Sequence, residues 1–287
     1  MAILPPLTLA IGGVSLLVAA SDRLSKRLAR PGVANEGLPG LTDSSDGQSV
    51  APASLPPGSA RKLVVVFGAT GGSGLAIVQV ALEKGYCVRA FVRNPRKLQA
   101  ELQELAEHEH LEVVEGDLRN LEAVKDAIEG AVAVISAAGA QPETAPGPMA
   151  AAIPAIVEGC RKCGVQKLIV QACALSAVPG EWWGLITQGR LARAVVRWQL
   201  SSNVIDDNER VMQYLYREVR DLAWVVTRPT WLEDGERSGP LAPNMDAFKP
   251  CSLRYLDLAD WTLAQLECNT YVGKMPRLCY PPVIHPI

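Results

Sequence analysis

The segment Lys62–Gly74, with the sequence KLVVVFGATGGSG, joins a run of apolar residues to a glycine-rich turn. Residues 63–67 are all apolar, which is typical of a strand buried on both faces of a parallel sheet. The glycines follow at three-residue spacing, and the next residues, LAIVQVALEKG, have the apolar pattern of a helix. The segment therefore predicts a strand, a turn and a helix in direct succession.

This succession is typical of a dinucleotide-binding site. One glycine permits the tight turn, a second lets a diphosphate approach the backbone, and a third lets the helix pack closely on the strand. Amide N–H groups at the start of the helix face the phosphates, and the helix dipole favours their negative charge. Glycine loops also serve as plain turns, but the flanking strand and helix favour a binding site. The predicted phosphate-binding residues are Gly68, Thr70, Gly71, Gly72, Ser73 and Gly74.

Three segments resemble one protein family. The segments GATGGSG (68–74), FVRNPRKL (91–98) and EGDLRN (115–120) are similar to those of atypical short-chain dehydrogenases/reductases of the NmrA-like, NAD(P)H-binding type. The resemblance extends over about residues 61 to 275 and implies a nicotinamide dinucleotide as the ligand.

The rest of the chain continues an alternation of strands and helices. Apolar segments at 86–92, 111–118, 131–140, 165–172 and 222–227 have the composition of strands, and helical patterns lie between most of them. Such alternation predicts an α/β fold, a Rossmann-type doubly wound parallel sheet. We expect this domain to occupy residues 61–287, after an apolar N-terminal segment and a proline-rich linker.

Arg93 favours NADP over NAD as the cofactor. Proteins that bind NAD usually place Asp or Glu after the second strand, where the carboxylate hydrogen-bonds the ribose 2′-hydroxyl. This chain has Arg93 there, followed by Arg96 and Lys97. A guanidinium can bind a 2′-phosphate that a carboxylate would repel. The sequence therefore predicts NADPH, with NAD as the less favoured cofactor and a solvated basic turn as the alternative interpretation.

The family resemblance implies further cofactor contacts. Its Asp-Leu pair after the third strand lies against the adenine, which here corresponds to Asp117 and Leu118. Asp117 could instead cap the following helix. Pro229 matches an Arg-Pro step near the nicotinamide. Small residues at the end of the fourth strand would let the ribose and phosphate lie against bare backbone; these are Ala137, Ala138 and Gly139.

The catalytic groups of the working dehydrogenases are missing. Those enzymes use a Tyr as proton donor and a Lys four residues later, and none of the six tyrosines here has a Lys at that distance. At the end of the fifth strand, Ala172 and Cys173 occupy the positions of the usual Ser. Arg210 lies near a family Lys, where it could bind or orient a ligand or be an exposed helix charge, but a guanidinium does not act as a base. No catalytic residue is predicted.

Two functions stay open on these observations. The missing groups favour an NADP(H)-binding structural or sensing subunit of a membrane-associated or organellar assembly. The alternative is an NADPH-dependent reductase of a quinone or carbonyl substrate that takes its proton from solvent or substrate. The phosphate loop and Arg93 fit both functions.

The N-terminal sixty residues have the composition of a targeting or anchoring region and a linker. Residues 1–21 carry no charge, and basic residues follow up to Arg30. Residues 1–30 therefore fit a targeting segment, a membrane anchor with a basic flank, or a helix that docks on a partner. Residues 31–60 are a linker rich in Pro, Gly and Ser. We expect a plastid or mitochondrial location with membrane association, or a cytoplasmic location as the alternative, and contacts to a membrane or protein complex through residues 1–60.

Composition argues against several other functions. The net charge is −2, so no basic field indicates nucleic acid as a partner. The seven cysteines are scattered, and the pair Cys160 and Cys163 has no second pair at metal-binding spacing. We therefore expect reduced thiols and no metal site.

Two features of the second half have weaker interpretations. Trp182, Trp183 and Trp198 lie among arginines, in either a substrate or partner surface or an amphipathic covering helix. Asp257 is expected to cap the last helix, and Trp261 is expected to lie in the core.

Overall fold

The computed structural model describes residues 62–139, 147–180, 202–244 and 251–281. The strands of the main sheet are β1 (Leu63–Phe67), β2 (Cys87–Val92), β3 (Leu111–Glu115), β4 (Ala133–Ser136), β5 (Lys167–Gln171) and β6 (Trp224–Thr227). The helices are α2 (Gly72–Glu83), α3 (Pro95–Leu102), α4 (Leu121–Ala127), α5 (Pro148–Cys163), α7 (Ser202–Glu218) and α8 (Tyr255–Ala264). Two small sheets pair β8 (Ala242–Asn244) with β10 (Arg277–Cys279), and β7 (Trp231–Glu233) with β9 (Ser252–Arg254).

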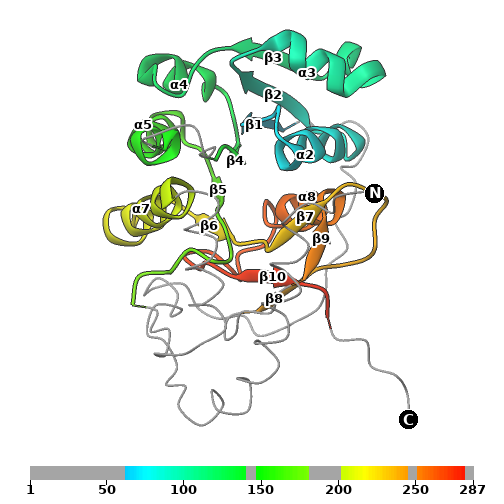
Figure 1. The fold of residues 1–287 in the computed structure, drawn as a ribbon. Coiled ribbons are helices and arrows are strands. Elements are labelled where there is room, and N and C mark those ends of the chain that lie inside the picture. Colours follow the sequence, from blue (N-terminus) through cyan, green and yellow to red (C-terminus); the bar gives the residue numbers. More distant parts are fainter. Residues whose placement is uncertain (1–61, 140–146, 181–201, 245–250, 282–287) are drawn as a thin grey trace, which may run out of the picture.

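The main sheet confirms the predicted doubly wound fold. Its six parallel strands lie in the order β3-β2-β1-β4-β5-β6, with helices on both faces (Figure 1). β1 pairs with β2 on one side and with β4 on the other, so the strand order reverses beside β1. The crevice at such a reversal, outside the carboxyl ends of the strands, is where open α/β sheets bind ligands.

β1 is buried on both faces, as its unbroken apolar run predicts. Val65 and Phe67 pack into the core that α4, α5 and α7 form with one face of the sheet. Val64 and Val66 pack into the opposite core, beneath α2, α3 and α8. All four side chains are fully buried, so the start of the glycine turn is fixed from both sides.

The helix after β2 is shorter than its sequence pattern suggests. The apolar pattern predicts one helix over residues 96–108, whereas α3 ends at Leu102 and a 3-10 turn covers Gln103–Glu107. Gln103 has a φ of 51°, which an α-helix cannot continue. The start of α3 is fixed by the Asn94 side chain, which accepts a hydrogen bond from the Lys97 N–H at 3.1 Å.

The expected role of Asp257 is wrong, and that of Trp261 is confirmed. Arg254 is the residue at the N-cap of α8, and Asp257 lies buried in the first turn. The Asp257 carboxylate accepts hydrogen bonds from the Ser238 N–H at 2.9 Å and the Tyr280 hydroxyl at 2.6 Å. It therefore ties α8 to distant loops instead of capping its own helix. Trp261 packs in the core beside β6.

Asp207 ties α7 to the start of α5. Its carboxylate accepts hydrogen bonds from the N–H groups of Ala150 at 2.8 Å and Met149 at 3.4 Å. A Cβ at Gly147 would overlap the Asp207 carboxyl group, so glycine leaves the room this contact needs. Burial raises the pKa of Asp207, and the amide groups and Arg210 oppose this rise only in part.

The raised pKa of Asp207 predicts the sign of a pH effect on stability. A carboxyl group whose pKa is higher in the folded state stabilises the fold below its unfolded pKa, close to 3.8, and this stabilisation is lost as the pH rises through the folded value. Asp207→Asn does not titrate. We therefore expect the free energy of unfolding of the wild type, relative to that of Asp207→Asn, to fall as the pH rises above about 3.8. Urea unfolding of both proteins at a series of pH values measures this difference. A rise of the wild type relative to the variant over the same pH values would contradict the expectation.

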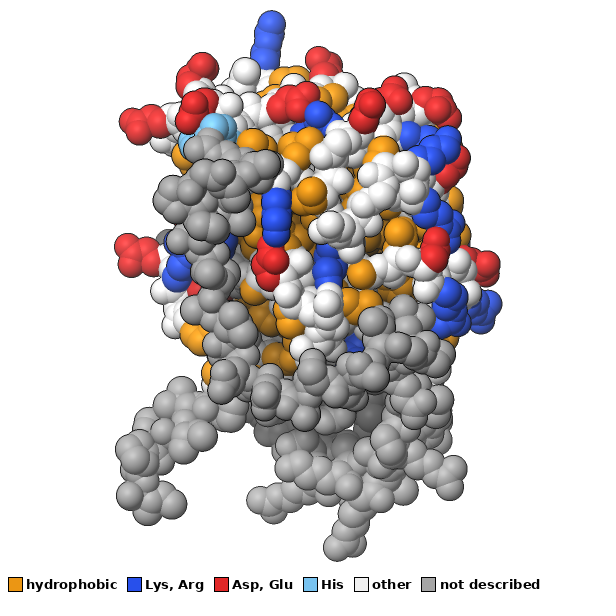
Figure 2. Space-filling model, turned by 180° about the vertical axis from the view of Figure 1, so that it is seen from behind, with side chains coloured by type: hydrophobic (Ala, Val, Ile, Leu, Met, Phe, Trp, Pro, Cys, Tyr) orange, Lys and Arg blue, Asp and Glu red, His pale blue; other side chains and the backbone are white. Residues whose placement is uncertain are grey.

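The described surface carries charges of both signs. Figure 2 shows Asp and Glu side chains gathered toward the upper end of one face, with Lys and Arg among them. Ion pairs join α8 to the end of α2. Asp260 lies 2.8 Å from Lys84, and Arg237, from the loop after β7, lies 2.6 Å from Asp260 and 2.8 Å from Glu83. Such partly exposed pairs contribute little stability each, so we attribute the docking of α8 on α2 to the apolar contacts beneath them.

Some expectations concern residues that the structure does not describe. These are the segment 1–30, the linker 31–60, and the tryptophans Trp182, Trp183 and Trp198. In the described part of the chain, none of the helices combines the length and the apolar composition needed to cross a membrane.

Candidate functional site

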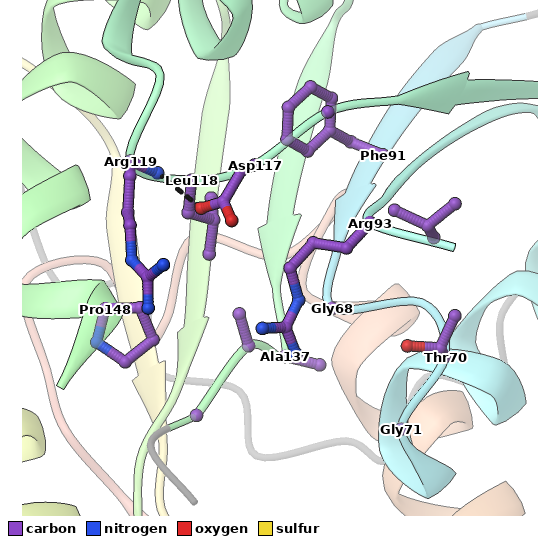
Figure 3. Close-up of a pocket in the computed structure, with 14 residues that line it drawn as sticks. Gly68, Thr70, Gly71, Phe91, Arg93, Asp117, Leu118, Arg119, Ala137 and Pro148 are labelled. Atoms are coloured by element: carbon purple, nitrogen blue, oxygen red, sulfur yellow. Dashed lines mark hydrogen bonds between the residues drawn. The ribbon is translucent and has the colours of Figure 1, made fainter. Parts of the chain in front are cut away.

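A pocket lies at the carboxyl ends of β1 to β4, on the crevice that the strand order predicts (Figure 3). Most of the predicted cofactor residues meet there. The predicted residues that line it are Gly68, Thr70, Gly71, Arg93, Asp117, Leu118, Ala137, Ala138 and Gly139. The structure therefore brings together residues from the ends of all these strands.

Gly68 forms the turn that opens the pocket. It has a φ of 80°, which favours glycine, and a Cβ there would lie 2.5 Å from the Ala138 nitrogen. The Gly71 N–H donates to the Gly68 carbonyl at 3.1 Å and closes the turn. Gly68 thus permits both the turn and the close approach of the loop after β4.

The start of α2 suits an anion. Gly71 is the N-cap residue and offers no side-chain hydrogen bond to the helix, and the first turn contains no acidic residue. The positive end of the helix dipole therefore faces the pocket without a carboxylate to neutralise it. A diphosphate at this place would be stabilised by the dipole and by amide N–H groups.

The remaining glycine-loop residues contribute to packing. Gly72, Ser73 and Gly74 form the first turn of α2 and do not line the pocket. A Cβ at Gly72 would lie 2.5 Å from the ring of Tyr255, and a Cβ at Gly74 would overlap the Gly68 carbonyl. The Ser73 hydroxyl accepts a hydrogen bond from Gln171 at 3.0 Å. That Gly72, Ser73 and Gly74 contact the phosphates stays a prediction.

Arg93 is exposed at the end of β2 and extends its guanidinium into the pocket toward Ala137 (Figure 3). Among the described residues it forms no ion pair, in contrast to Arg89, which binds Glu112 at 2.7 Å. The charge of Arg93 is therefore available to an anionic ligand in the pocket.

Asp117 is oriented by its own loop. One carboxylate oxygen accepts a hydrogen bond from the Arg119 N–H at 2.8 Å, and the side chain faces the pocket (Figure 3). The alternative that Asp117 caps α4 is wrong, because Asn120 is the N-cap residue and accepts from the Ala123 N–H at 3.2 Å. The second carboxylate oxygen of Asp117 can accept a hydrogen bond from an exocyclic amine.

Five lining residues were not predicted from the sequence: Phe91, Val92, Gly116, Arg119 and Pro148. A Cβ at Gly116 would overlap the ring of Phe91, which packs edge-to-face against Phe67 at 5.3 Å. Four of them lie within the two quoted family segments at the ends of β2 and β3, but the sequence assigned them no role. Pro148 begins α5 and reaches the pocket only through the tertiary fold.

The ends of β5 and β6 lie outside this pocket. Pro229 is buried, does not line the pocket, and accepts a hydrogen bond from the Ala174 N–H at 2.9 Å. Burial raises the pKa of the Cys173 thiol, although Arg228 and Arg277 oppose the rise. The thiol is therefore protonated at neutral pH. Arg210 is exposed on α7 and does not line the pocket.

The described ranges contain no cluster of three or more His, Cys, Asp or Glu side chains that could hold a metal ion. Cys160 and Cys163 are free thiols at the end of α5, and Cys160 is fully buried. Burial raises the pKa of Cys160 to about 12.

The burial of Cys160 predicts that the thiols of Cys160 and Cys163 differ in reactivity. In the native protein near pH 8, we expect iodoacetamide to label the half-buried Cys163 and to leave Cys160 unmodified, because only the thiolate reacts and the core excludes the reagent. Peptide mass spectrometry measures both sites, with urea-unfolded protein as the control in which both react. Equal native labelling, or a disulfide between the two, would contradict this.

Comparison with known proteins agrees with the fold. The model of the NAD(P)H-binding family matches residues 68–269. Among solved structures, the anaerobillin reductase ChuY from Escherichia coli O157:H7 is 18% identical with a TM-score of 0.60, over 79% of this chain and 100% of that one. A short-chain dehydrogenase/reductase from Veillonella parvula in complex with NADP is 19% identical with a TM-score of 0.60, over 77% and 96%. An oxidoreductase from Lactococcus lactis is 16% identical with a TM-score of 0.61, over 76% and 91%. At such identities the structures show a shared fold.

Proposed function

The chain belongs to the NAD(P)H-binding family, and on this premise we propose that it binds NADP(H) in the pocket at the ends of β1 to β4. The diphosphate lies at the start of α2, and the ribose lies against Ala137, Ala138 and Gly139. The adenine lies beside Asp117 and Leu118. A neighbour of the same fold was crystallised with NADP, which supports a dinucleotide of this kind.

The observation that carries the choice of NADP is the position of Arg93. It follows β2, where the ribose 2′ group lies in dinucleotide-binding folds. Its guanidinium enters the pocket and forms no ion pair within the described residues. A 2′-phosphate can accept two charge-assisted hydrogen bonds from it, whereas NADH offers only a hydroxyl.

We further propose that the protein acts as an NADP(H)-binding structural or sensing subunit. The chain lacks the Tyr and Lys spacing of the working dehydrogenases, and the half-buried Cys173 stands at the place of the usual Ser, with burial raising the pKa of its thiol. Residues 1–60 would supply the contact to a membrane or a larger assembly, and an organelle is the proposed location. No proton-transfer group beside the nicotinamide is required for such a role.

A second candidate function is the reduction of a quinone or carbonyl substrate. The observation that favours it is a pair of buried hydroxyl groups near the ends of β5 and β6. Ser176 and Thr227 are almost fully buried, and within the described part of the chain neither hydroxyl has a hydrogen-bond partner. A substrate oxygen that reached these hydroxyls would satisfy their hydrogen-bonding capacity. NADPH would supply the hydride, and solvent or the substrate itself would supply the proton.

One experiment separates the two functions. NADPH is titrated into the full chain while intrinsic tryptophan fluorescence is followed, and loss of NADPH absorbance is then measured with a panel of quinones and carbonyl compounds. Tight binding without turnover supports the subunit or sensor, and turnover supports the reductase. Absence of binding would contradict both.

A further inference from the structure

We infer that Arg119 stacks its guanidinium on the adenine ring of the bound dinucleotide. The inference rests on the proposed function and extends it: two arginines would recognise different parts of adenosine 2′-phosphate. Arg93 would bind the phosphate, and Arg119 would bind the base.

Arg119 and Arg93 reach the pocket from the ends of different strands. Figure 3 shows its side chain running from the end of β3 toward Pro148, while Arg93 enters from the end of β2. Asp117 and Leu118 lie between the two arginines in this view. A base whose exocyclic amine reached Asp117 would therefore lie next to Arg119, which belongs to the same turn.

The backbone of Arg119 is fixed for this contact. Its N–H donates to the Asp117 carboxylate at 2.8 Å, and the Asn120 N–H donates to the Asp117 carbonyl at 2.9 Å. This turn couples the residue that would bind the adenine amine to the residue that would cover the ring. The backbone of Arg119, from which the guanidinium extends, is therefore held beside the Asp117 carboxylate.

The charge of Arg119 is not used by an acidic neighbour. Within the described residues Arg119 forms no ion pair, whereas Arg161 binds Asp221 at 2.7 Å and Arg254 binds Glu233 at 3.0 Å. Its guanidinium can therefore be placed by a ligand instead of by a carboxylate.

The chemistry of the other lining residues favours stacking over phosphate binding. The sole aromatic lining residue in the described ranges is Phe91, and its ring packs beneath Gly116 and against Phe67. A guanidinium is planar and stacks well on aromatic faces, so Arg119 can supply the flat surface that a base needs. The neighbouring Leu118 and Pro148 are apolar and add van der Waals contact.

The test compares NADPH, NADH and adenosine 2′,5′-bisphosphate by calorimetry on the full chain. We expect Arg119→Ala to weaken all three by the same factor, about fivefold to tenfold, because each contains adenine. Arg119→Lys should recover little of this loss, since an ammonium group lacks the planar surface. Arg96→Ala is the matched control: Arg96 is an exposed arginine of α3 outside the pocket, so this variant should show only a weak, salt-dependent change in binding.

Each other outcome has a defined meaning. A loss with Arg119→Ala that is larger for NADPH than for NADH would make Arg119 a phosphate ligand and overturn the inference. Unchanged binding would make it a solvated surface charge and also overturn it. Wild-type protein that binds neither dinucleotide would contradict the proposed function itself, which is distinguishable because the first two outcomes require wild-type binding.

Discussion

Replacing Arg93 by Ala is expected to weaken NADPH binding by about 1.5–3 kcal/mol, which is about tenfold or more in Kd, and to leave NADH binding nearly unchanged. The loss arises because the guanidinium that enters the pocket is the group available to bind a 2′-phosphate with two charge-assisted hydrogen bonds. NADH has no phosphate there, so it loses little. Calorimetric titration of both cofactors measures the difference directly.

Two controls make the Arg93 result specific. Arg96→Ala removes an equal charge three residues after Arg93, outside the pocket lining, and only a weak, salt-dependent change is expected from it. Arg93→Lys keeps the charge but loses the planar fork, so it should recover part of the NADPH affinity. If Arg93→Ala weakened NADPH and NADH equally, the assignment of Arg93 to the phosphate would be wrong.

The parts of the fold and site that the sequence predicts are local. The apolar run of β1 could be recognised because a strand buried on both faces needs no alternation of polar residues. Gly68, Arg93 and Asp117 could be placed because each is the first or second residue after a strand. Parallel strands bring all such positions to one edge of the sheet.

The parts that the sequence does not predict depend on residues far apart in the chain. Asp257 looks like a cap for its own helix, but its carboxylate binds Ser238 and Tyr280 instead. Pro148 reaches the pocket because α5 packs against α4 and α7. An exposed arginine such as Arg119 has no periodicity that would mark it before the pocket is seen.

Gly74→Ala is expected to lower the free energy of unfolding by on the order of 3 kcal/mol. A Cβ at this position would overlap the Gly68 carbonyl oxygen and lie 2.7 Å from the Gly68 carbonyl carbon and 2.8 Å from the Ala69 Cα. All of these are backbone atoms of the turn that joins β1 to α2, so no side chain can rotate away. α2 would have to move outward from a strand that is buried on both faces.

The gain in helix propensity from glycine to alanine is too small to reverse the expected loss of stability. Alanine is better than glycine in a helix by about 1 kcal/mol, and less in a first turn, so helix propensity cannot offset the overlap.

Gly71→Ala is the matched control, because its Cβ would lie 3.6 Å from the same Gly68 oxygen, an ordinary contact. Urea unfolding should therefore show Gly71→Ala close to wild type and Gly74→Ala far below it. In cofactor titrations, by contrast, Gly71→Ala should lose affinity, since its methyl group would lie where the diphosphate approaches the backbone. Equal stability of the two variants would mean that α2 does not depend on this close contact with β1.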